Sequence, residues 1–357
     1  MSEVYTLSSH QQNKWHDLLL STCQYDVYHL PEYHILAERN GEGEARLIVY
    51  EDGDHFIAMP LLFRSIKLIS GFDDIGDEYR DATSVYGYPG PVASCGLSES
   101  VIAGFCQSLS RYLVNTNTIS VFSRLNPLLN QVALVGDLGE IKGIGKTVSI
   151  NLTLSENVQW SQYRTNHKRD INKLKKLGAI VLQDHEKHFL SQFVTLYNET
   201  MERVEAAKHY FLPLSYYEDI LSMREQRYQL FVCKLGDEII AGGLFSYCEG
   251  IVQYHLGGTS TLHLNLSPMK LVFEEVRRWA INRGANIFHL GGGVGSQNDS
   301  LFEFKAGFSS SHHQFQVWNW IVQPDIYRNL EIRRRQWLET KGRFLNTTSF
   351  FPAYRAN

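Results

Sequence analysis

The stretch RLIVYEDGDHFIAMPLLF, residues 46–63, decides the fold, because the stretch QLFVCKLGDEIIAGGLFS, residues 229–246, repeats it. Aligned without gaps, the two share seven identical residues in eighteen, including the pairs Gly53-Asp54 and Gly236-Asp237. Each stretch consists of two β-rich runs around a Gly-Asp turn, which is typical of a β-hairpin. The repeat predicts two copies of one domain.

The segments around the hairpins support this duplication. In the first half, a helix near residues 98–115 leads into a strand at 118–122. In the second half, helices near 188–204 and 213–225 precede the hairpin. A strand at 251–256, a helix and a strand at 286–290 follow it. In the helix between these two strands, Ser267 is the expected N-cap and Pro268 the first residue, and the helix ends near Gly284. We expect its apolar face to be buried in the core.

This order of elements resembles the GNAT acyltransferase fold. We therefore predict an α/β protein of the α+β type, with two tandem GNAT-like domains whose mixed, largely antiparallel sheets are flanked by helices. The expected domains are residues 1–148 on the acceptor side and 149–323 on the donor and catalytic side. A basic helical segment beginning at residue 325 predicts a C-terminal appendage over 324–357.

Composition excludes several classes of protein. Of 357 residues, 43% are hydrophobic and 20% are charged, which indicates a globular chain rather than a disordered one. The net charge of −4 argues against a protein that coats nucleic acid such as DNA, although a local basic stripe can still bind phosphates. Five cysteines without a CxxC pair favour a reducing, cytoplasmic compartment over a disulfide scaffold. With no signal peptide and no long apolar run, we expect no transmembrane segment and at most peripheral membrane contact.

The densest group of polar residues is HLGGGVGSQNDSLFEFKAGFS, residues 289–309. Its glycines, followed by DSLF at 299–302 and FKAGF at 304–308, resemble the "GG…LxxFKxxF" signature of the Fem-like (FemABX) aminoacyl and acyl transferases. The segments DATSVYGYPG at 81–90, RLNPL at 124–128 and LNLSP at 264–268 resemble further parts of that family. The resemblance spans both halves, and it implies a transferase that forms an amide.

Amide formation from an ester or thioester needs a held carbonyl, a neutral amine and stabilisation of the tetrahedral oxyanion. We assign the last task to Lys305, expecting its cation to lie between Phe304 and Phe308 in a partly desolvated site. The alternative is a surface lysine whose stem covers apolar neighbours.

Three residues are candidates for the general base: Asp81 and Asp299 in polar loops, and His289 at a strand end. Each has a structural alternative, such as bracing a turn or a buried hydrogen bond. Base assistance by the substrate is a further alternative.

For the acceptor, the loop with Tyr86 and Tyr88 offers aromatic faces to a sugar or peptide, although it could equally be an ordinary irregular turn. The resemblance places acceptor binding in the first domain, near Arg124. The complete list of expected substrate-binding residues is Tyr86, Tyr88, Arg124, Asn126, Tyr254 and Phe304.

For the donor, the stretch RTNHKRDINKLKK at 164–176 places Arg164, Lys168 and Arg169 on or beside one basic helix, which either grips phosphates or is simply solvated. Asn265 joins this set. The stretch before the 269–282 helix has no glycine, and Pro268 supplies no N–H, so a CoA pyrophosphate would lose part of its cradle. We therefore expect aminoacyl-tRNA as co-substrate ahead of acyl-CoA.

The sequence contains no metal-binding spacing, and its late glycines lack the context of a Rossmann fingerprint. We expect no metal, no bound cofactor, and a monomer or dimer. Our main hypothesis is an N-acyltransferase acting on an amine of a cell-envelope sugar or peptide precursor. The alternatives are an acyl-CoA-dependent N-acetyltransferase of an amino sugar or small molecule, and a non-catalytic tandem module that binds glycans or peptides.

Overall fold

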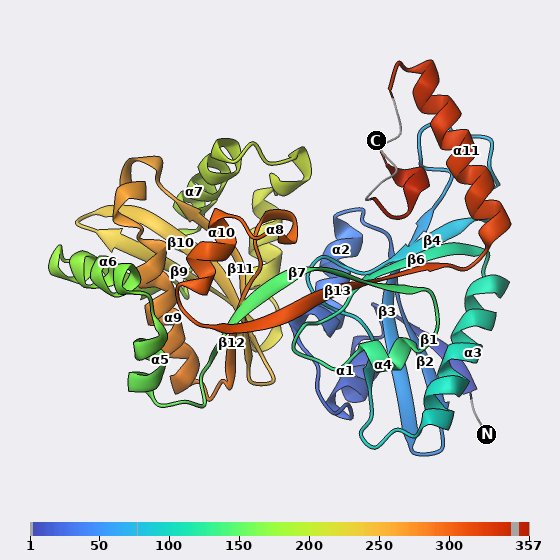
Figure 1. Cartoon of the computed structure of the whole chain (residues 1–357), viewed down its shortest axis with the longest axis horizontal. Helices are drawn as coiled ribbons and strands as arrows, with labels where there is room; N and C mark the ends of the chain where they lie inside the picture. Colours follow the sequence, from blue (N-terminus) through green and yellow to red (C-terminus); the bar gives the residue numbers. More distant parts are fainter. Residues whose placement is uncertain (1–2, 77, 344–349, 357) are drawn as a thin grey trace. The chain divides into compact units, whose positions relative to one another are not determined.

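The computed structural model describes residues 3–76, 78–343 and 350–356. The chain forms two compact units (Figure 1). The first contains residues 1–144 and 315–357, and the second contains residues 145–314.

The sheet of the first unit has the strand order β1-β2-β3-β4-β6-β13. Strands β4 and β6 are parallel, with α3 in the connection between them, and the other neighbours are antiparallel. The elements are β1 Glu3–Ser8, α1 Gln12–Leu20, α2 Pro31–Arg39, β2 Glu44–Asp52, β3 His55–Ser65, β4 Arg80–Thr83, β5 Val92–Ala93, α3 Glu99–Asn115, β6 Thr118–Arg124, α4 Val132–Val135, β13 Ser311–Ile321 and α11 Pro324–Thr340.

The sheet of the second unit has the order β8-β9-β10-β11-β12-β7. Strands β11 and β12 are parallel, with α9 in the connection between them. The elements are β7 Glu140–Asn151, α5 Glu156–Gln162, α6 Thr165–Lys176, β8 Ile180–Gln183, α7 Leu190–Arg203, α8 Leu214–Leu221, β9 Tyr228–Leu235, β10 Glu238–Cys248, β11 Ile251–Thr259, η4 Thr261–Leu266, α9 Met269–Asn282, β12 Ile287–Gly291, η5 Val294–Ser296 and α10 Ser300–Ala306.

Both predicted hairpins are present, and their turns are equivalent. Asp52 pairs with His55 and Leu235 with Glu238, so each turn has two central residues. The first of these is Gly53 in one turn and Gly236 in the other, with φ of 62° and 60°. A glycine with positive φ at this position is typical of the turns that close a hairpin, because it adds no strain. The two units therefore share one strand order and one turn chemistry.

The helix of each crossover supplies one face of its unit's core. In the second unit the predicted apolar face of α9 is buried against the sheet, with Val272, Phe273, Val276 and Ala280 all 0% exposed. In the first unit α3 buries Phe105 and Leu109 in the corresponding way.

Two details differ from the sequence predictions. Ser267 does not cap α9: it has a left-handed backbone with φ 52°, and the N-cap position belongs to Pro268, which offers no side-chain cap. The segment after residue 323 is not a separate appendage. Tyr327 and Leu330 of α11 share a buried cluster with Ile66 and Phe72, so this segment belongs to the first unit.

The expected boundary at residue 148 falls inside β7, because that strand begins in the first unit and ends in the second. Residues 344–349 and 357 of the expected appendage lie outside the described residues.

The cysteine prediction also needs correction. A disulfide joins Cys23 and Cys95, whereas Cys106, Cys233 and Cys248 are free thiols. The two bonded cysteines are 72 residues apart in sequence, but the amide of Cys23 donates to the carbonyl of Ala93, which brings the segments together. Among the described helices, none has the length and apolar character needed to cross a membrane.

Candidate functional site

The second unit contains a place where two parallel strands separate. Strands β11 and β12 are in register from Ile251 with Ile287 to Gln253 with His289, and the described pairing ends there. β11 then continues to Thr259 along β10. The next residue after the last pair is Tyr254 on β11. The paired strands open at this point, which is our candidate site.

Lys305 lies beside this opening. It is on α10 and only 5% exposed; its Nζ donates to the carbonyl oxygen of Gly292 at 2.5 Å and lies 5.4 Å from the centroid of the Tyr254 ring. Burial lowers the pKa of Lys305 to about 7, against the opposing effect of Asp299. A buried ammonium with few ligands is suited to stabilising a developing negative charge.

The aromatic neighbours of Lys305 differ from those predicted. The cation faces Tyr254 rather than lying between Phe304 and Phe308. The Phe304 and Phe308 rings pack on the ring of Phe273 in α9, with centroids 5.6 and 5.3 Å away. They orient α10 from its apolar side, so the phenylalanines of this motif position Lys305 without contacting its charge.

The glycine at position 307 is required for a steric reason. A Cβ at this position would lie 2.2 Å from the ring of His167 on α6. His167 Nε2 and the Phe304 carbonyl oxygen are 2.9 Å apart, and the amide of Arg164 donates to the carbonyl of Gly307 at 2.8 Å. The start of α6 is therefore attached to the end of α10, and only glycine allows this distance.

The carboxylate of Asp299 is engaged in holding the loop. One oxygen accepts from the Phe302 amide at 2.8 Å as the N-cap of α10, and the other accepts from the Val294 amide at 2.9 Å. This is a capping arrangement. The geometry therefore favours a positioning role for Asp299 over that of a general base.

His289 is fully buried on β12. Its Nδ1 lies 2.6 Å from Oε1 of Gln253, so Nδ1 carries the proton and Nε2 is the accepting nitrogen. Burial lowers the pKa of His289 to about 3, with further contributions from His313 and Lys305. The ring is thus neutral, and it lies close enough to Lys305 to be affected by its charge.

Asp81 belongs to the first unit and is fully buried. Its carboxylate accepts from Arg64 at 2.8 Å, from Arg355 and from the hydroxyl of Tyr354. The oxygens of this carboxylate are thus occupied by two guanidinium groups and a hydroxyl, which indicates a structural role. Asp81 attaches the C-terminal segment to β4.

The aromatic loop of the first unit presents one exposed face. Tyr86 is 48% exposed, and the guanidinium of Arg124 lies 5.7 Å from its ring centroid. Tyr88 is half-buried and packs edge-on against Tyr28 and Phe315. Tyr86 and Arg124 therefore form an accessible pair, whereas Tyr88 anchors the loop.

Asn126 is 2% exposed and holds the same loop in place through hydrogen bonds. Its Nδ2 donates to Asp26 at 2.9 Å, and its backbone amide donates to Gln131. The Gln131 side chain in turn donates to the carbonyl of Pro89. The arrangement makes Asn126 a positioning residue rather than one that faces a ligand.

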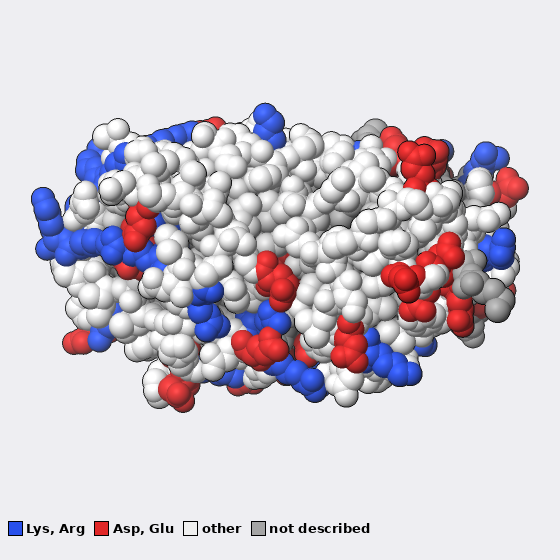
Figure 2. Space-filling view, turned by 90° about the horizontal axis from the view of Figure 1, so that it is seen from below, with Lys and Arg blue, Asp and Glu red and all other residues white. Residues whose placement is uncertain are grey.

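The expected donor residues are on or next to α6. Arg164 pairs with Glu303 at 2.8 Å, Lys168 donates to the Ser161 carbonyl, and Arg169 pairs with Asp170. Ile171 and Leu174 bury the opposite face of the helix. Figure 2 shows Lys and Arg side chains gathered at the end of the molecule that carries α6, at the left of Figures 1 and 2.

The first turn of α9 offers little to a pyrophosphate. The amides of Lys270 and Leu271 already donate to the carbonyls of Ser267 and Pro268 at 3.0 Å. Asn265, in η4 just before this turn, is exposed. A helix N-terminus binds an anion through amides that have no acceptor, so this turn is a weak anion site.

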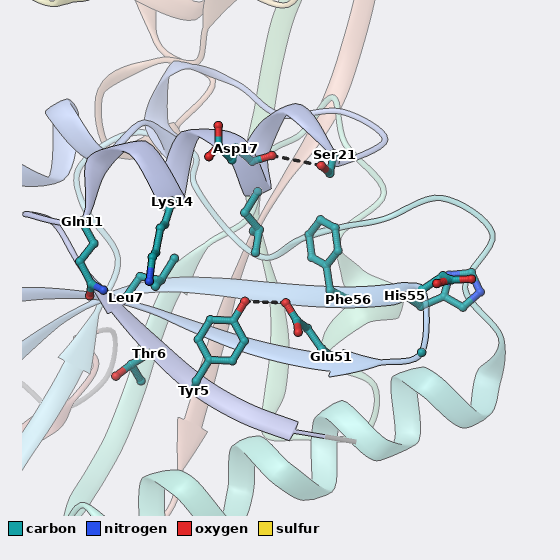
Figure 3. Close-up of a pocket in the computed structure, with 13 residues that line it drawn as sticks. Tyr5, Thr6, Leu7, Gln11, Lys14, Asp17, Ser21, Glu51, His55 and Phe56 are labelled. Atoms are coloured by element: carbon teal, nitrogen blue, oxygen red, sulfur yellow. Dashed lines mark hydrogen bonds between the residues drawn. The ribbon is translucent and has the colours of Figure 1, made fainter. Parts of the chain in front are cut away.

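A hollow of about 740 Å³ lies in the first unit, beside β1, α1 and the β2–β3 turn (Figure 3). Tyr5 and Glu51 are hydrogen bonded to each other on one side of it, and Lys14 extends from α1. None of its lining residues is among those predicted for the site, and we assign it no chemistry. Within the described residues, no cluster of three or more His, Cys, Asp or Glu could hold a metal ion.

Comparison with known proteins gives the fold a name. Residues 161–305 match the model of the family described as "Acetyltransferase (GNAT) domain". This match lies within the second unit, which therefore resembles a GNAT acetyltransferase domain. No curated protein matches the sequence.

Among solved structures, the crystal structure of FemX matches with a TM-score of 0.70 at 12% identity, covering 92% of this chain and 99% of FemX. The C-terminal domain of a putative lysylphosphatidylglycerol synthetase from Agrobacterium fabrum matches with a TM-score of 0.54 at 14% identity, covering 87% and 92% of the two chains. The L-PGS structure from Bacillus licheniformis matches with a TM-score of 0.53 at 15% identity, covering 86% and 91%.

These likenesses establish the fold, and the GNAT match establishes the acyltransferase class. The predictions of a Fem-like tandem GNAT fold and of an acyltransferase are confirmed. Gln253, whose side-chain amide contacts Nδ1 of His289, is not among the predicted site residues. Its signal was a polar residue between the apolar Val252 and the aromatic Tyr254 on a buried strand.

Proposed function

We propose that this GNAT acyltransferase forms an amide between an acyl or aminoacyl donor and an amine on a cell-envelope sugar or peptide precursor. The observation that carries the proposal is Lys305, a buried cation 5.4 Å from the Tyr254 ring where β11 and β12 separate. Such a group stabilises the oxyanion that forms when the amine attacks the donor carbonyl.

The envelope acceptor is supported by the structural neighbours. One is FemX, and another is named for making lysylphosphatidylglycerol, in which a lysyl group is carried by a lipid. In this proposal Tyr86 and Arg124 bind the acceptor, since an aromatic face beside a guanidinium suits a sugar or a polar peptide. We place the reaction in the cytoplasm.

We propose aminoacyl-tRNA as the donor. The amides of Lys270 and Leu271 in the first turn of α9 already have acceptors, whereas α6 presents Lys and Arg side chains at the surface. Exposed cations of this kind bind a phosphate backbone without needing a backbone cradle. Arg164, Lys168 and Arg169 would supply these contacts, and Asn265 lies before α9.

Filter binding tests the donor directly. A pool of labelled aminoacyl-tRNAs is retained on the protein at fixed salt, with deacylated tRNA and acetyl-CoA as competitors. Retention that deacylated tRNA does not abolish, and that selects particular amino acids, supports the proposal. Retention lost equally to deacylated tRNA would contradict recognition of the aminoacyl group.

A charge-reversal pair refines this test. Arg169→Glu with Lys173→Glu changes two exposed cations one turn apart on α6, and we expect the slope of log K against log salt to fall by roughly 2. Arg328→Glu, an exposed position on α11 in the first unit, is the control and should leave the slope unchanged. An unchanged slope in the α6 variant would remove this helix from donor binding.

Acyl-CoA is the second candidate donor, and the match to the GNAT acetyltransferase model favours it. Saturable acetyl-CoA binding without aminoacyl-tRNA retention would establish it. In either case we expect Lys305→Ala to lower kcat by about 10²- to 10³-fold while the protein remains folded. A variant with full turnover would instead favour a non-catalytic binding module.

A further inference from the structure

The Cys23–Cys95 disulfide lies at the surface of the first unit, and both of its cysteines are exposed. The free thiols differ from this pair, because Cys233 and Cys248 are buried and Cys106 is half-buried. Burial raises the pKa of the Cys106 thiol and raises the pKa of Cys233 to about 12, which makes both poor nucleophiles near neutral pH. The pair that a thiol from solution can reach is therefore the disulfide.

The two cysteines belong to segments that are held differently. Cys95 follows β5, which pairs with β3, and the hydroxyl of the preceding Ser94 accepts from the amide of Phe56 at 3.0 Å. Cys23 lies in the connection between α1 and α2, outside any helix or strand. Its amide donates to the carbonyl of Ala93 at 2.9 Å. The disulfide thus joins an irregular segment to one that is hydrogen bonded to the sheet.

The segment after Cys23 packs against the aromatic loop of residues 81–90, and we call residues 24–30 the brace. The ring of Tyr28 in the brace lies edge-on to the ring of Tyr88, with centroids 5.7 Å apart. A Cβ on Gly87 would lie 2.2 Å from the Tyr28 ring, so the loop and the brace are in direct contact. The position of the loop therefore depends on the position of the brace.

Hydrogen bonds connect the brace to the same loop through two further side chains. Asn126 donates to the carboxylate of Asp26 at 2.9 Å. The Nε2 of Gln131 donates to the carbonyl of Pro89 at 2.6 Å and lies 3.4 Å from Nε2 of His29. A shift of the brace would therefore be transmitted to the aromatic loop.

We propose that the Cys23–Cys95 disulfide is a reversible redox switch that controls acceptor binding by the aromatic loop. When oxidised, it holds the brace beside β5 and keeps Tyr86 and Arg124 in place. When it is reduced, the brace opens more easily and the loop binds the acceptor more weakly. In a reducing compartment, such as the cytoplasm that we propose, disulfides are usually transient or redox-sensing. The inference rests on the proposed function for the identity of the ligand.

The chemistry is thiol–disulfide exchange with a dithiol. One thiolate of the dithiol attacks a sulfur of the pair, the S–S bond breaks, and the other cysteine leaves as a thiolate that takes up a proton. The second thiol of the dithiol then attacks the mixed disulfide. The dithiol ends as a disulfide and both cysteines end as thiols, so two electrons and two protons pass to the protein. Exchange with an oxidised disulfide reverses the step.

Hydrogen exchange measured by mass spectrometry tests the switch in the full chain without knowledge of the acceptor. Oxidised protein is compared with protein reduced by dithiothreitol and with the double variant Cys23→Ser with Cys95→Ser. We expect both to exchange about tenfold faster or more in the brace and the aromatic loop, because the cross-link no longer limits their opening. Exchange in α11 and in the β9–β10 hairpin should not change. Glutathione disulfide should restore slow exchange in the reduced protein.

Cys106→Ser is the matched control, because it removes a half-buried free thiol from the same unit. Its exchange and its response to dithiothreitol should equal those of the unmodified chain. Equal exchange in oxidised and reduced protein would overturn the switch, as would two thiols that glutathione disulfide cannot join. Faster exchange throughout the first unit would also overturn it, since the disulfide would then be a general structural cross-link. All three results would leave the proposed acyl transfer intact.

Once a transfer assay exists, KM and kcat separate the switch from the transferase. Reduced protein and the double serine variant should show a KM for the acceptor that is raised by about three- to tenfold, with kcat nearly unchanged. An unchanged KM would overturn control of acceptor binding. Loss of turnover in Lys305→Ala bears on the transferase alone, so the failure of either proposal is recognised independently of the other.

Discussion

Lys305 combines two properties that normally exclude each other, a charge and nearly complete burial. The burial lowers its pKa to about 7, so the cation is present below this pH and is lost as the pH rises through it. If the cation stabilises the oxyanion, kcat falls above about pH 7. We expect Lys305→Arg, which stays charged, to move this alkaline limb to higher pH.

The measurement is the kcat–pH profile of both proteins. Because arginine is larger than lysine, a lower maximal kcat in Lys305→Arg is compatible with the prediction. The pH at which kcat falls is the quantity that tests it. An alkaline limb that stays near pH 7 in Lys305→Arg would assign it to another group.

Asp299 provides a second residue-scale test. Replacing its carboxylate with an amide should preserve a helix cap but abolish a general base. Asp299→Asn retains an oxygen for the Phe302 amide, so we expect nearly full turnover with a small loss of stability. Asp299→Ala removes both loop contacts and should lower the free energy of unfolding by about 0.5–2 kcal/mol. Turnover and thermal unfolding measure the two effects. A large loss of kcat in Asp299→Asn at unchanged stability would restore Asp299 as the base.

At the scale of elements, the attachment of α6 to α10 links the helix that we propose for donor binding to the helix that carries Lys305. We expect Gly307→Ala to separate the two helices, since the new methyl collides with the His167 ring, and to cost about 1–3 kcal/mol of stability together with much of kcat. The double variant Gly307→Ala with His167→Ala removes the collision.

A double-mutant cycle checks this explanation. Coupling between the two positions, with kcat partly recovered in the double variant, supports it. Additive losses would show that Gly307 acts on something other than the His167 ring.

At the scale of the whole molecule, the C-terminal segment completes the first unit. Ending the chain at Gln323 removes Tyr327, Leu330 and Tyr354 from the cluster around Phe72, and leaves Asp81 without Arg355. We expect this truncation to unfold or strongly destabilise the first unit, because breaking a buried ion pair alone costs about 3–5 kcal/mol. Thermal unfolding compares the two chains, and an unchanged melting temperature would support the appendage that the sequence predicts.

The sequence by itself determined the duplication, the order of the elements and the position of Lys305 in its motif. These follow from local signals: the Gly-Asp turns, the apolar periodicity of α9 and the compact motif from residue 299 to 308. Such signals are readable because hairpin turns and helix faces depend on residues close together in the chain.

Tertiary structure decided the contacts of the acids and the aromatic partner of Lys305. Asp81 is held by Arg355, 274 residues away, and Ser149 meets His313 across 164 residues. Cys23 meets Cys95 in the same way. These pairs arise only when segments distant in sequence become neighbours in the folded chain, and no local sequence pattern specifies which segments meet.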